Sequence, residues 1–157
     1  MRKRIYMLIN NLLIKRMEIL EEVYQELLHM PAVPPETGVV LGGNKHTITH
    51  LVFDNGMENK NYDIYSPNTF KINVVINGWI QDGIQFWGIA HSHRAISKNL
   101  SNGDKMYINE IMKKLHSSVD VLYFPIVIPK ETVIWFKAAY VNGKTLIKQT
   151  TVKRVNF

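Results

Sequence analysis

The sequence contains no cysteine among its 157 residues, so the chain forms no disulfide bond and offers no thiolate ligand to a metal ion. It also lacks an apolar stretch approaching the roughly 18 residues of a membrane-spanning helix. The basic N-terminus has the charge of a signal peptide, but Asn10, Asn11 and Lys15 interrupt the apolar run, and no small-residue cleavage site follows. We therefore expect neither a signal peptide nor a transmembrane helix, and we expect a cytoplasmic location.

Internal repeats and low-complexity segments are also absent, and the length favours a single domain over residues 1–157. Hydrophobic residues make up 46% and charged residues 20%, so an ordinary packed core is expected. The formal net charge is +6, and basic residues gather at both termini, with Lys153 and Arg154 near the C-terminus. Such clusters either form solvated faces or bind phosphate groups or an acidic partner, and both alternatives stay open.

The spacing of apolar residues predicts three helices, over residues 11–29, 69–81 and 102–115. The second is ambiguous, because Asn77-Gly78 between β-branched residues is also typical of a hairpin turn. Strands are predicted over residues 39–41, 47–54, 84–90, 120–128, 132–141 and 144–151, with Pro125 at an edge or bulge and Asn142-Gly143 in a tight turn. Runs of strands beside helices indicate an α/β or α+β fold.

Two histidines, His91 and His93, follow the apolar run 84–90. Residues i and i+2 of a strand point to the same face, so both imidazoles can reach one ion. Ser101 and Asp104 follow at the start of the third predicted helix, whose apolar stripe places Asp104 on the inward side. Ser101 and Asp104 also stand close to the spacing of a capping box. Two imidazoles and one carboxylate leave a tetrahedral zinc ion one open position, as in catalytic zinc sites.

The full pattern, H-x-H-x(7)-S-x(2)-D, resembles the signature of the JAMM metalloproteases, also called MPN-type or JAB domains. That family has an upstream pattern like E-x-G-G-x-L-x-G, and the segment from Glu36 to Gly43 resembles it, with Gly38 and Leu41 also in the matching places. The resemblance covers residues 10–141. It implies a curved mixed β-sheet flanked by about three helices, the MPN/JAB (cytidine deaminase-like) architecture.

The resemblance implies a zinc-dependent peptidase or isopeptidase, with one Zn²⁺ per chain held by His91, His93 and Asp104. In that family's mechanism, Glu36 would be the general base that accepts the proton of a water molecule. Ser101 would donate a hydrogen bond to the oxyanion that forms on the substrate. The substrate expected is the C-terminal tail of a ubiquitin-like or sulfur-carrier-type protein, because the chain is nearly a bare domain, as in prokaryotic members of the family.

Two positions depart from the family pattern. Arg94 follows the second histidine, where the family usually has proline, and Val39 replaces the second glycine of the upstream pattern. Neither change removes a ligand or the base, but Arg94 alters the mouth of the site and is a candidate substrate-binding residue. The polar segment 55–68 and residues 94–100 are expected to form the substrate-facing rim, because loops of this kind often bind substrates.

Two other classes of function compete with the hydrolase. A non-catalytic MPN scaffold would typically have lost ligands, and this chain retains all of them. A RadC-like nucleic-acid-associated protein would use the basic termini, although we expect neither nucleic acid nor a membrane as the partner. The remaining histidines, His29, His46, His50 and His116, are not expected to be ligands, and Trp79, Trp87 and Trp135 are expected in the core.

Overall fold

The computed structural model describes residues 16–57 and 64–156. Its helices are α2 (Glu21–Leu28), α3 (Thr69–Gln81) and α4 (Asn102–Leu115). Its strands are β1 (Glu18–Leu20), β2 (Gly38–Gly43), β3 (Thr47–Asp54), β4 (Gln85–Ser92), β5 (Val121–Tyr123), β6 (Ile126–Ile128), β7 (Thr132–Val141), β8 (Lys144–Thr150) and β9 (Lys153–Val155). Within these ranges, no helix has the length and apolar character to span a membrane.

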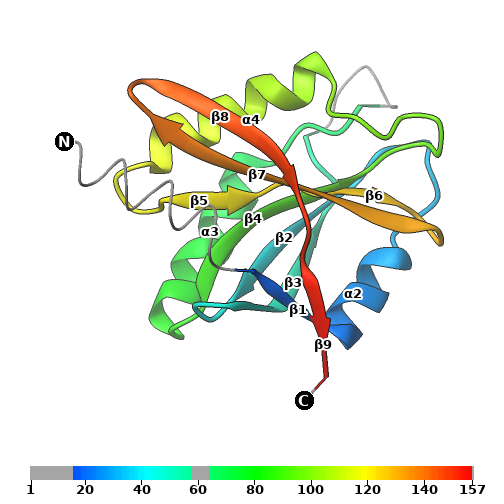
Figure 1. Cartoon of the computed structure of the whole chain (residues 1–157), viewed down its shortest axis with the longest axis horizontal. Coiled ribbons are helices and arrows are strands. Elements are labelled where there is room, and N and C mark those ends of the chain that lie inside the picture. The colour runs from blue at the N-terminus through cyan, green and yellow to red at the C-terminus, as the bar shows by residue number, and fades with distance from the viewer. Residues whose placement is uncertain (1–15, 58–63, 157) are drawn as a thin grey trace.

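All nine strands belong to one mixed sheet, in which β2 and β4 are central (Figure 1). From β2 the sheet continues through β3 and β1 to β9, and from β4 it continues through β5 and β6 to β7 and β8. Strand β4 pairs in parallel with both β5 and β6, and β7 pairs antiparallel with both. The α+β fold with a mixed sheet and helices on its faces is therefore confirmed.

The strand predicted over residues 120–128 is divided into β5 and β6 by an irregularity at Phe124 and Pro125, where an edge or bulge was predicted for the proline. Proline has no N–H to donate to a neighbouring strand. The carbonyl of Pro125 nevertheless accepts a hydrogen bond from the backbone N–H of His91 at 3.1 Å. This break therefore lies directly beside His91, near the end of β4.

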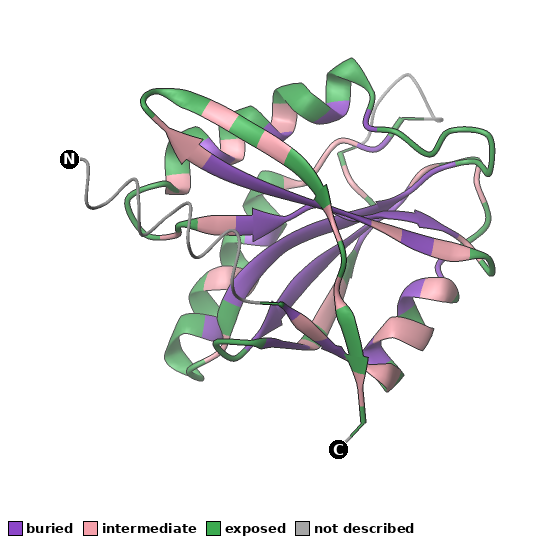
Figure 2. Cartoon of the chain, in the orientation of Figure 1, coloured by how far each residue is buried: buried purple, intermediate pink, exposed green. Residues whose placement is uncertain are grey.

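The two faces of the sheet bury different hydrophobic clusters, and the central strands are almost wholly buried (Figure 2). Helices α3 and α4 cover one face, where their residues Ile72, Trp79 and Ile108 join a cluster with β4 and β7. Helix α2 covers part of the other face through Val23 and Leu27. The end of β4, with His91 in it and His93 just after it, is buried in this fold.

The predicted helix over residues 11–29 is wrong at its start. Residues 18–20 form β1, which pairs in parallel with β3 and β9, and the helix begins only at Glu21. Met17 and Ile19 are both buried, which is the period-two pattern of a strand. The same apolar residues also fit a helical stripe when read together with Leu20 and Tyr24. Residues 11–15 of this prediction lie outside the described residues.

Residues 69–81 form a helix, so the hairpin alternative for Asn77-Gly78 is wrong. The Asn68 side chain caps the helix by accepting a hydrogen bond from the N–H of Lys71 at 3.1 Å. A hairpin does occur at Asn142-Gly143, where the φ angles of 51° and 76° suit a type I′ turn between β7 and β8. Asn-Gly therefore turned the chain only where both flanking segments pair with each other.

The basic C-terminus is partly tied into the fold. Arg154 on β9 donates hydrogen bonds through Nε and Nη2 to the two carboxylate oxygens of Glu21 on α2. Its guanidinium also lies over the ring of Tyr24, 4.1 Å from the centroid. The pKa of Glu21 falls from 4.5 to about 2, chiefly because of the hydrogen bonds from Arg154 and Gln25. This pair joins the last strand to the first described helix.

Replacing Glu21 with Gln should remove one source of acid sensitivity. A carboxylate whose pKa is depressed on folding stabilises the protein above its unfolded pKa. That contribution is therefore present above pH 4.5 and is lost as the pH falls towards 2. Thermal melts of wild type and Glu21→Gln should differ most at neutral pH and converge near pH 2. The exposed Glu26 on the same helix provides the matched control, Glu26→Gln. A constant difference across this range would show that the pair does not act through the charge of Glu21.

Candidate metal centre

A β-bulge in β4 determines which way the two histidines face. The register between β2 and β4 shifts between Leu41 and Gly42, which leaves Trp87 as an extra residue of β4. The next residue, Gly88, has a φ of +135°, and a Cβ atom added there would lie 1.8 Å from the carbonyl oxygen of Tyr123. Only glycine fits this position. Beyond the bulge, the alternation of faces is reset for the rest of the strand.

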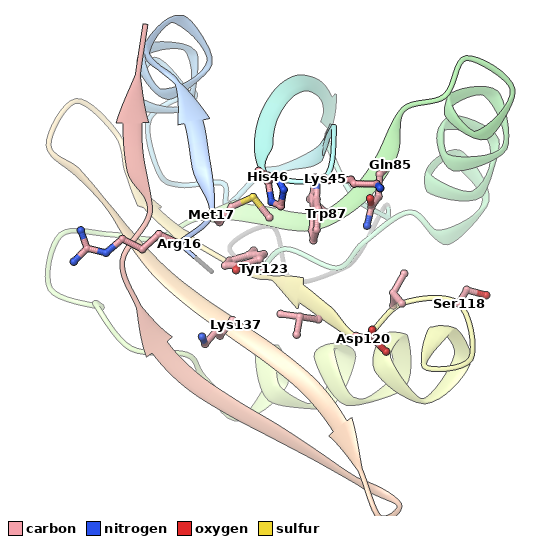
Figure 3. A pocket seen from close by; sticks show the side chains of 12 residues that line it. Arg16, Met17, Lys45, His46, Gln85, Trp87, Ser118, Asp120, Tyr123 and Lys137 are labelled. Atoms are coloured by element: carbon pink, nitrogen blue, oxygen red, sulfur yellow. The ribbon is translucent and has the colours of Figure 1, made fainter. Parts of the chain in front are cut away.

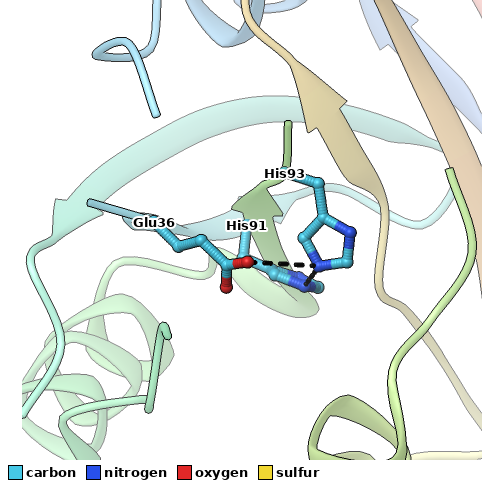
Figure 4. Close-up of side chains that lie close together, drawn as sticks. All are labelled: Glu36, His91 and His93. Atoms are coloured by element: carbon cyan, nitrogen blue, oxygen red, sulfur yellow. Dashed lines mark hydrogen bonds and ion pairs between the residues drawn. The ribbon is translucent and has the colours of Figure 1, made fainter. Parts of the chain in front are cut away.

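After the bulge, Ile89, His91 and His93 point to the face that α3 and α4 cover. The two imidazoles meet through their Nε2 atoms, which are 2.7 Å apart (Figure 4). Both rings are buried, with 0% of His91 and 3% of His93 exposed. The sequence prediction that the two imidazoles share one face and converge on one point therefore agrees with the structure.

Asp104 reaches the same point from the first turn of α4. Its Oδ1 lies 3.2 Å from Nε2 of His91, and its Oδ2 lies 3.1 Å from Nε2 of His93. Asp104 also forms a capping box with Ser101: its Oδ2 accepts the Ser101 N–H at 2.8 Å, and its own N–H donates to the Ser101 Oγ at 3.1 Å. The capping and inward-pointing interpretations are therefore not alternatives, because one carboxylate does both.

The outer nitrogens of both rings are held by groups of other segments. Nδ1 of His93 lies 2.8 Å from the carbonyl oxygen of Ser97, which can only accept, so Nδ1 carries a proton. Nδ1 of His91 lies 3.0 Å from the hydroxyl of Tyr107, a partly buried residue of α4. With Nδ1 protonated, Nε2 of His93 offers a lone pair to a metal ion when the ring is neutral, and it donates a hydrogen bond to the Asp104 carboxylate when the ring is protonated.

The charges around this point favour a cation. Burial alone would raise the pKa of Asp104, but hydrogen bonds from His91 and His93 hold that pKa far below its usual range. Burial would likewise lower the pKa of His93, yet the hydrogen bonds to Asp104 and Ser97 and the charge of Glu36 raise it. A carboxylate held in its charged form beside two imidazoles is a suitable environment for a metal ion.

Glu36 lies beside the histidines, just before β2. Its Oε1 is 3.9 Å from Nε2 of His93, while its Oε2 accepts a hydrogen bond from the backbone N–H of Tyr65 at 3.1 Å. One carboxylate oxygen is therefore fixed by the protein, and the other faces the histidines (Figure 4). Glu36, His91 and His93 offer ligand atoms that all lie within 4.8 Å of one another.

Tyr65, which the sequence did not reveal as a site residue, supports the positions of His91 and Glu36. Its ring is stacked against that of His91, with centroids 6.0 Å apart. Its hydroxyl donates to Oδ2 of the buried Asp54 at 2.7 Å. The ring passes directly over Gly38, where an added Cβ would lie 2.2 Å from it. This contact explains why glycine stands two residues after Glu36. An isolated tyrosine in a polar loop gave no signal of that role.

The other candidates lie as follows. Arg94 is exposed and follows His93 directly, so its role at the mouth of the site stays a prediction. Of the expected rim, residues 58–63 lie outside the described residues. Val39, which departs from the family pattern, is fully buried in the hydrophobic cluster that includes Val23 and Leu27 of α2. The three tryptophans are buried, as predicted.

No family model matches this sequence, and no curated protein sequence is significantly similar to it. The fold, however, has solved relatives. A protein of Desulfitobacterium hafniense superposes with a TM-score of 0.62 at 16% identity, over 90% of this chain and 94% of that one. A JAB1/MPN domain protein of Archaeoglobus fulgidus superposes with a TM-score of 0.52 at 18% identity, over 89% of this chain and all (100%) of that one.

A protein of Salinibacter ruber gives a TM-score of 0.51 at 12% identity, over 88% of this chain and 92% of that one. At identities this low, the similarity concerns the fold alone. The chain therefore has the fold of JAB1/MPN domains, as its resemblance to that family predicted. The chemistry of the site has to be argued from its own residues.

Proposed function

We propose that this protein is a zinc-dependent peptidase or isopeptidase of the JAMM type. The observation that carries the proposal is the convergence of two buried imidazole nitrogens and one carboxylate on a single point, with a second carboxylate beside them. The fold of JAB1/MPN domains supports it, because the resemblance in sequence and the similarity in structure concern the same family.

The donor set fits zinc. Nitrogen and oxygen ligands about 2.0 Å from a tetrahedral zinc ion are roughly 3.3 Å apart. The contacts of Asp104 with His91 and His93, at 3.2 and 3.1 Å, are close to that separation. The two Nε2 atoms are somewhat closer, at 2.7 Å. Histidine ligands usually donate their outer N–H to a second group, and the Ser97 carbonyl and the Tyr107 hydroxyl are placed to accept.

Distance and burial support different roles for the two carboxylates. Only 3% of the Asp104 side chain is exposed, and it contacts both histidines. The Glu36 side chain is 19% exposed and lies 3.9 Å from its nearer histidine. We therefore assign His91, His93 and Asp104 as ligands and keep Glu36 for proton transfer. Zinc, when bound, would supply a Lewis acid that activates water near neutral pH.

The chain's own residues would then carry the proton and hold the substrate. Glu36 would accept a proton on Oε1, the oxygen that faces the histidines, and later pass it to the leaving amine. Ser101 Oγ already accepts the N–H of Asp104, so its hydroxyl proton is available to donate to a substrate oxyanion. Arg94 would contact the incoming tail of a ubiquitin-like or carrier protein.

Zinc content and hydrolysis together test this proposal. Wild-type protein should contain about one zinc per chain by elemental analysis, and His91→Ala should contain much less. The assay would use a ubiquitin-like or carrier-protein tail joined to a reporter amine. Chelation should abolish cleavage by the wild type, and added zinc should restore it. A protein that folds but retains no zinc after reconstitution would contradict the proposal and favour the non-catalytic scaffold.

A further inference from the structure

An apolar hollow lies between α3 and α4, on the face of the sheet that these two helices cover. Its volume is about 330 Å³. Ile72 of α3, Ile111 of α4 and Ile89 of β4 contribute to its lining, and all three take part in the hydrophobic packing on this side of the sheet. Folding therefore brings apolar side chains from three elements around one space that a small molecule can enter.

The hollow adjoins the candidate metal centre without including it. Among the described residues, its lining contains Tyr65 and Tyr107 but none of the three assigned ligands. The Tyr65 ring is stacked on His91, and the Tyr107 hydroxyl lies 3.0 Å from Nδ1 of His91. The two tyrosine rings meet edge to face, with centroids 6.3 Å apart. These rings therefore stand between the hollow and His91, so a molecule in the hollow would contact the groups that support His91 rather than the ion.

A lysine stands at the rim of this hollow. Lys114, in the last turn of α4, is exposed and contributes to the lining. Glu110 lies one helical turn before it, at a spacing that often gives an ion pair, but no ion pair joins the two in the part of the chain that the structure describes. The net charge of the chain is +6, which favours an anion over a cation at this rim. The Lys114 ammonium is therefore available to an anionic group of a ligand.

We propose that this hollow binds a fatty acid of medium chain length, an unbranched hydrocarbon that ends in a carboxylate. The carboxylate pairs with Lys114, and the hydrocarbon lies over the isoleucines and ends against Tyr107. Lys114 and Tyr107 are about 10 Å apart along α4, at 1.5 Å per residue, which suits octanoate. Small-molecule sites occupy about 300–1,000 Å³, so 330 Å³ suits one such ligand.

The bound chain also regulates the metal centre, because it restrains the Tyr107 ring whose hydroxyl faces Nδ1 of His91. A ligand that orders a group shared with a second site strengthens binding at that second site. By reciprocity, zinc should strengthen the binding of the fatty acid by the same factor. This effect on the metal rests on the proposed function, whereas the binding of the fatty acid does not.

Isothermal titration of chelated protein at constant ionic strength would compare hexanoate, octanoate and octanol. Each buried methylene should tighten binding about fourfold, so octanoate should bind roughly tenfold more tightly than hexanoate. Lys114→Gln should weaken octanoate binding about three- to tenfold and leave octanol binding unchanged. Lys113→Gln is the matched control, because Lys113 is exposed on the same turn but does not line the hollow, and it should bind octanoate like wild type.

Two further variants locate the site. Asn73→Phe fills the hollow from an exposed position on α3, and it should weaken the binding of octanoate and octanol alike. A separate hollow on the opposite face of the sheet also combines a lysine with apolar rings, from Lys45, Trp87 and Tyr123 (Figure 3). Lys45→Gln should leave octanoate binding unchanged if the ligand lies between α3 and α4.

Equal binding of hexanoate and octanoate, unchanged octanoate binding by Lys114→Gln or Asn73→Phe, or weakened binding by Lys45→Gln would each overturn the proposed site. Octanoate should bind severalfold more tightly to protein of confirmed zinc occupancy than to chelated protein, and equal affinities would overturn the regulation. Binding seen only with zinc would assign the carboxylate to the ion and overturn the site as well. Octanoate binding without any hydrolysis of the tail would count against the proposed function alone.

Discussion

Replacing Glu36 with Gln should lower the rate of tail hydrolysis by about 10²- to 10⁴-fold and leave zinc binding intact. Glutamine keeps the length of the side chain, and its carbonyl oxygen can still accept the Tyr65 N–H that now binds Oε2. Its amide nitrogen cannot take up a proton at the position of Oε1, the oxygen facing His93. The substitution therefore separates proton transfer from metal binding and from folding.

The measurement is the hydrolysis rate at matched zinc occupancy, with the melting temperature recorded for each variant. Glu110→Gln is the control, because Glu110 is exposed on α4 and contacts neither histidine. It should hydrolyse the tail like wild type. If Glu36→Gln were as fast as wild type at equal zinc content, another group would be the base. Loss of zinc together with activity would instead make Glu36 a ligand, as its distance to the histidines also permits.

The centre of the candidate site could be predicted from the sequence because strands and helices repeat with fixed periods. The i, i+2 spacing of His91 and His93 sets their common direction, and the stripe through Ile108 turns Asp104 inward. The face of the sheet towards which the two histidine side chains point could not be predicted. It depends on the bulge at Trp87 and Gly88, where the carbonyl oxygen of Tyr123 on another strand leaves no room for a side chain.

The supporting contacts were not predictable for a related reason. Tyr65 contributes its N–H to Glu36, its ring to His91 and its hydroxyl to Asp54, and these groups come from three separate segments. The local periodicity of a sequence does not encode such contacts between distant segments. The start of α2 was predicted wrongly for the same reason, because β1 depends on pairing with β9, the last strand of the chain. Apolar spacing alone fits helix and strand equally well over so short a stretch.

Replacing Asp104 with Asn should abolish the stabilisation of the protein by zinc. A ligand present at about 1,000 times its dissociation constant stabilises the folded state by about 4 kcal/mol. For a domain of this size that corresponds to roughly 8–16 °C in melting temperature, at about 2–4 °C per kcal/mol. Asparagine can still accept the Ser101 N–H and complete the helix cap, but it lacks the charge that faces His91 and His93.

Ser101→Ala is the matched control, because it removes the other half of the same capping box. It should lower the melting temperature of the chelated protein by the equivalent of about 1 kcal/mol. It should nevertheless retain the full shift on adding zinc, since Ser101 is not assigned as a ligand. The comparison is the difference between zinc-loaded and chelated melts of each variant, so that changes in the cap cancel. A zinc shift that survives in Asp104→Asn but disappears in Glu36→Gln would exchange the roles of the two carboxylates, because Glu36 would then complete the ligand set with the histidines.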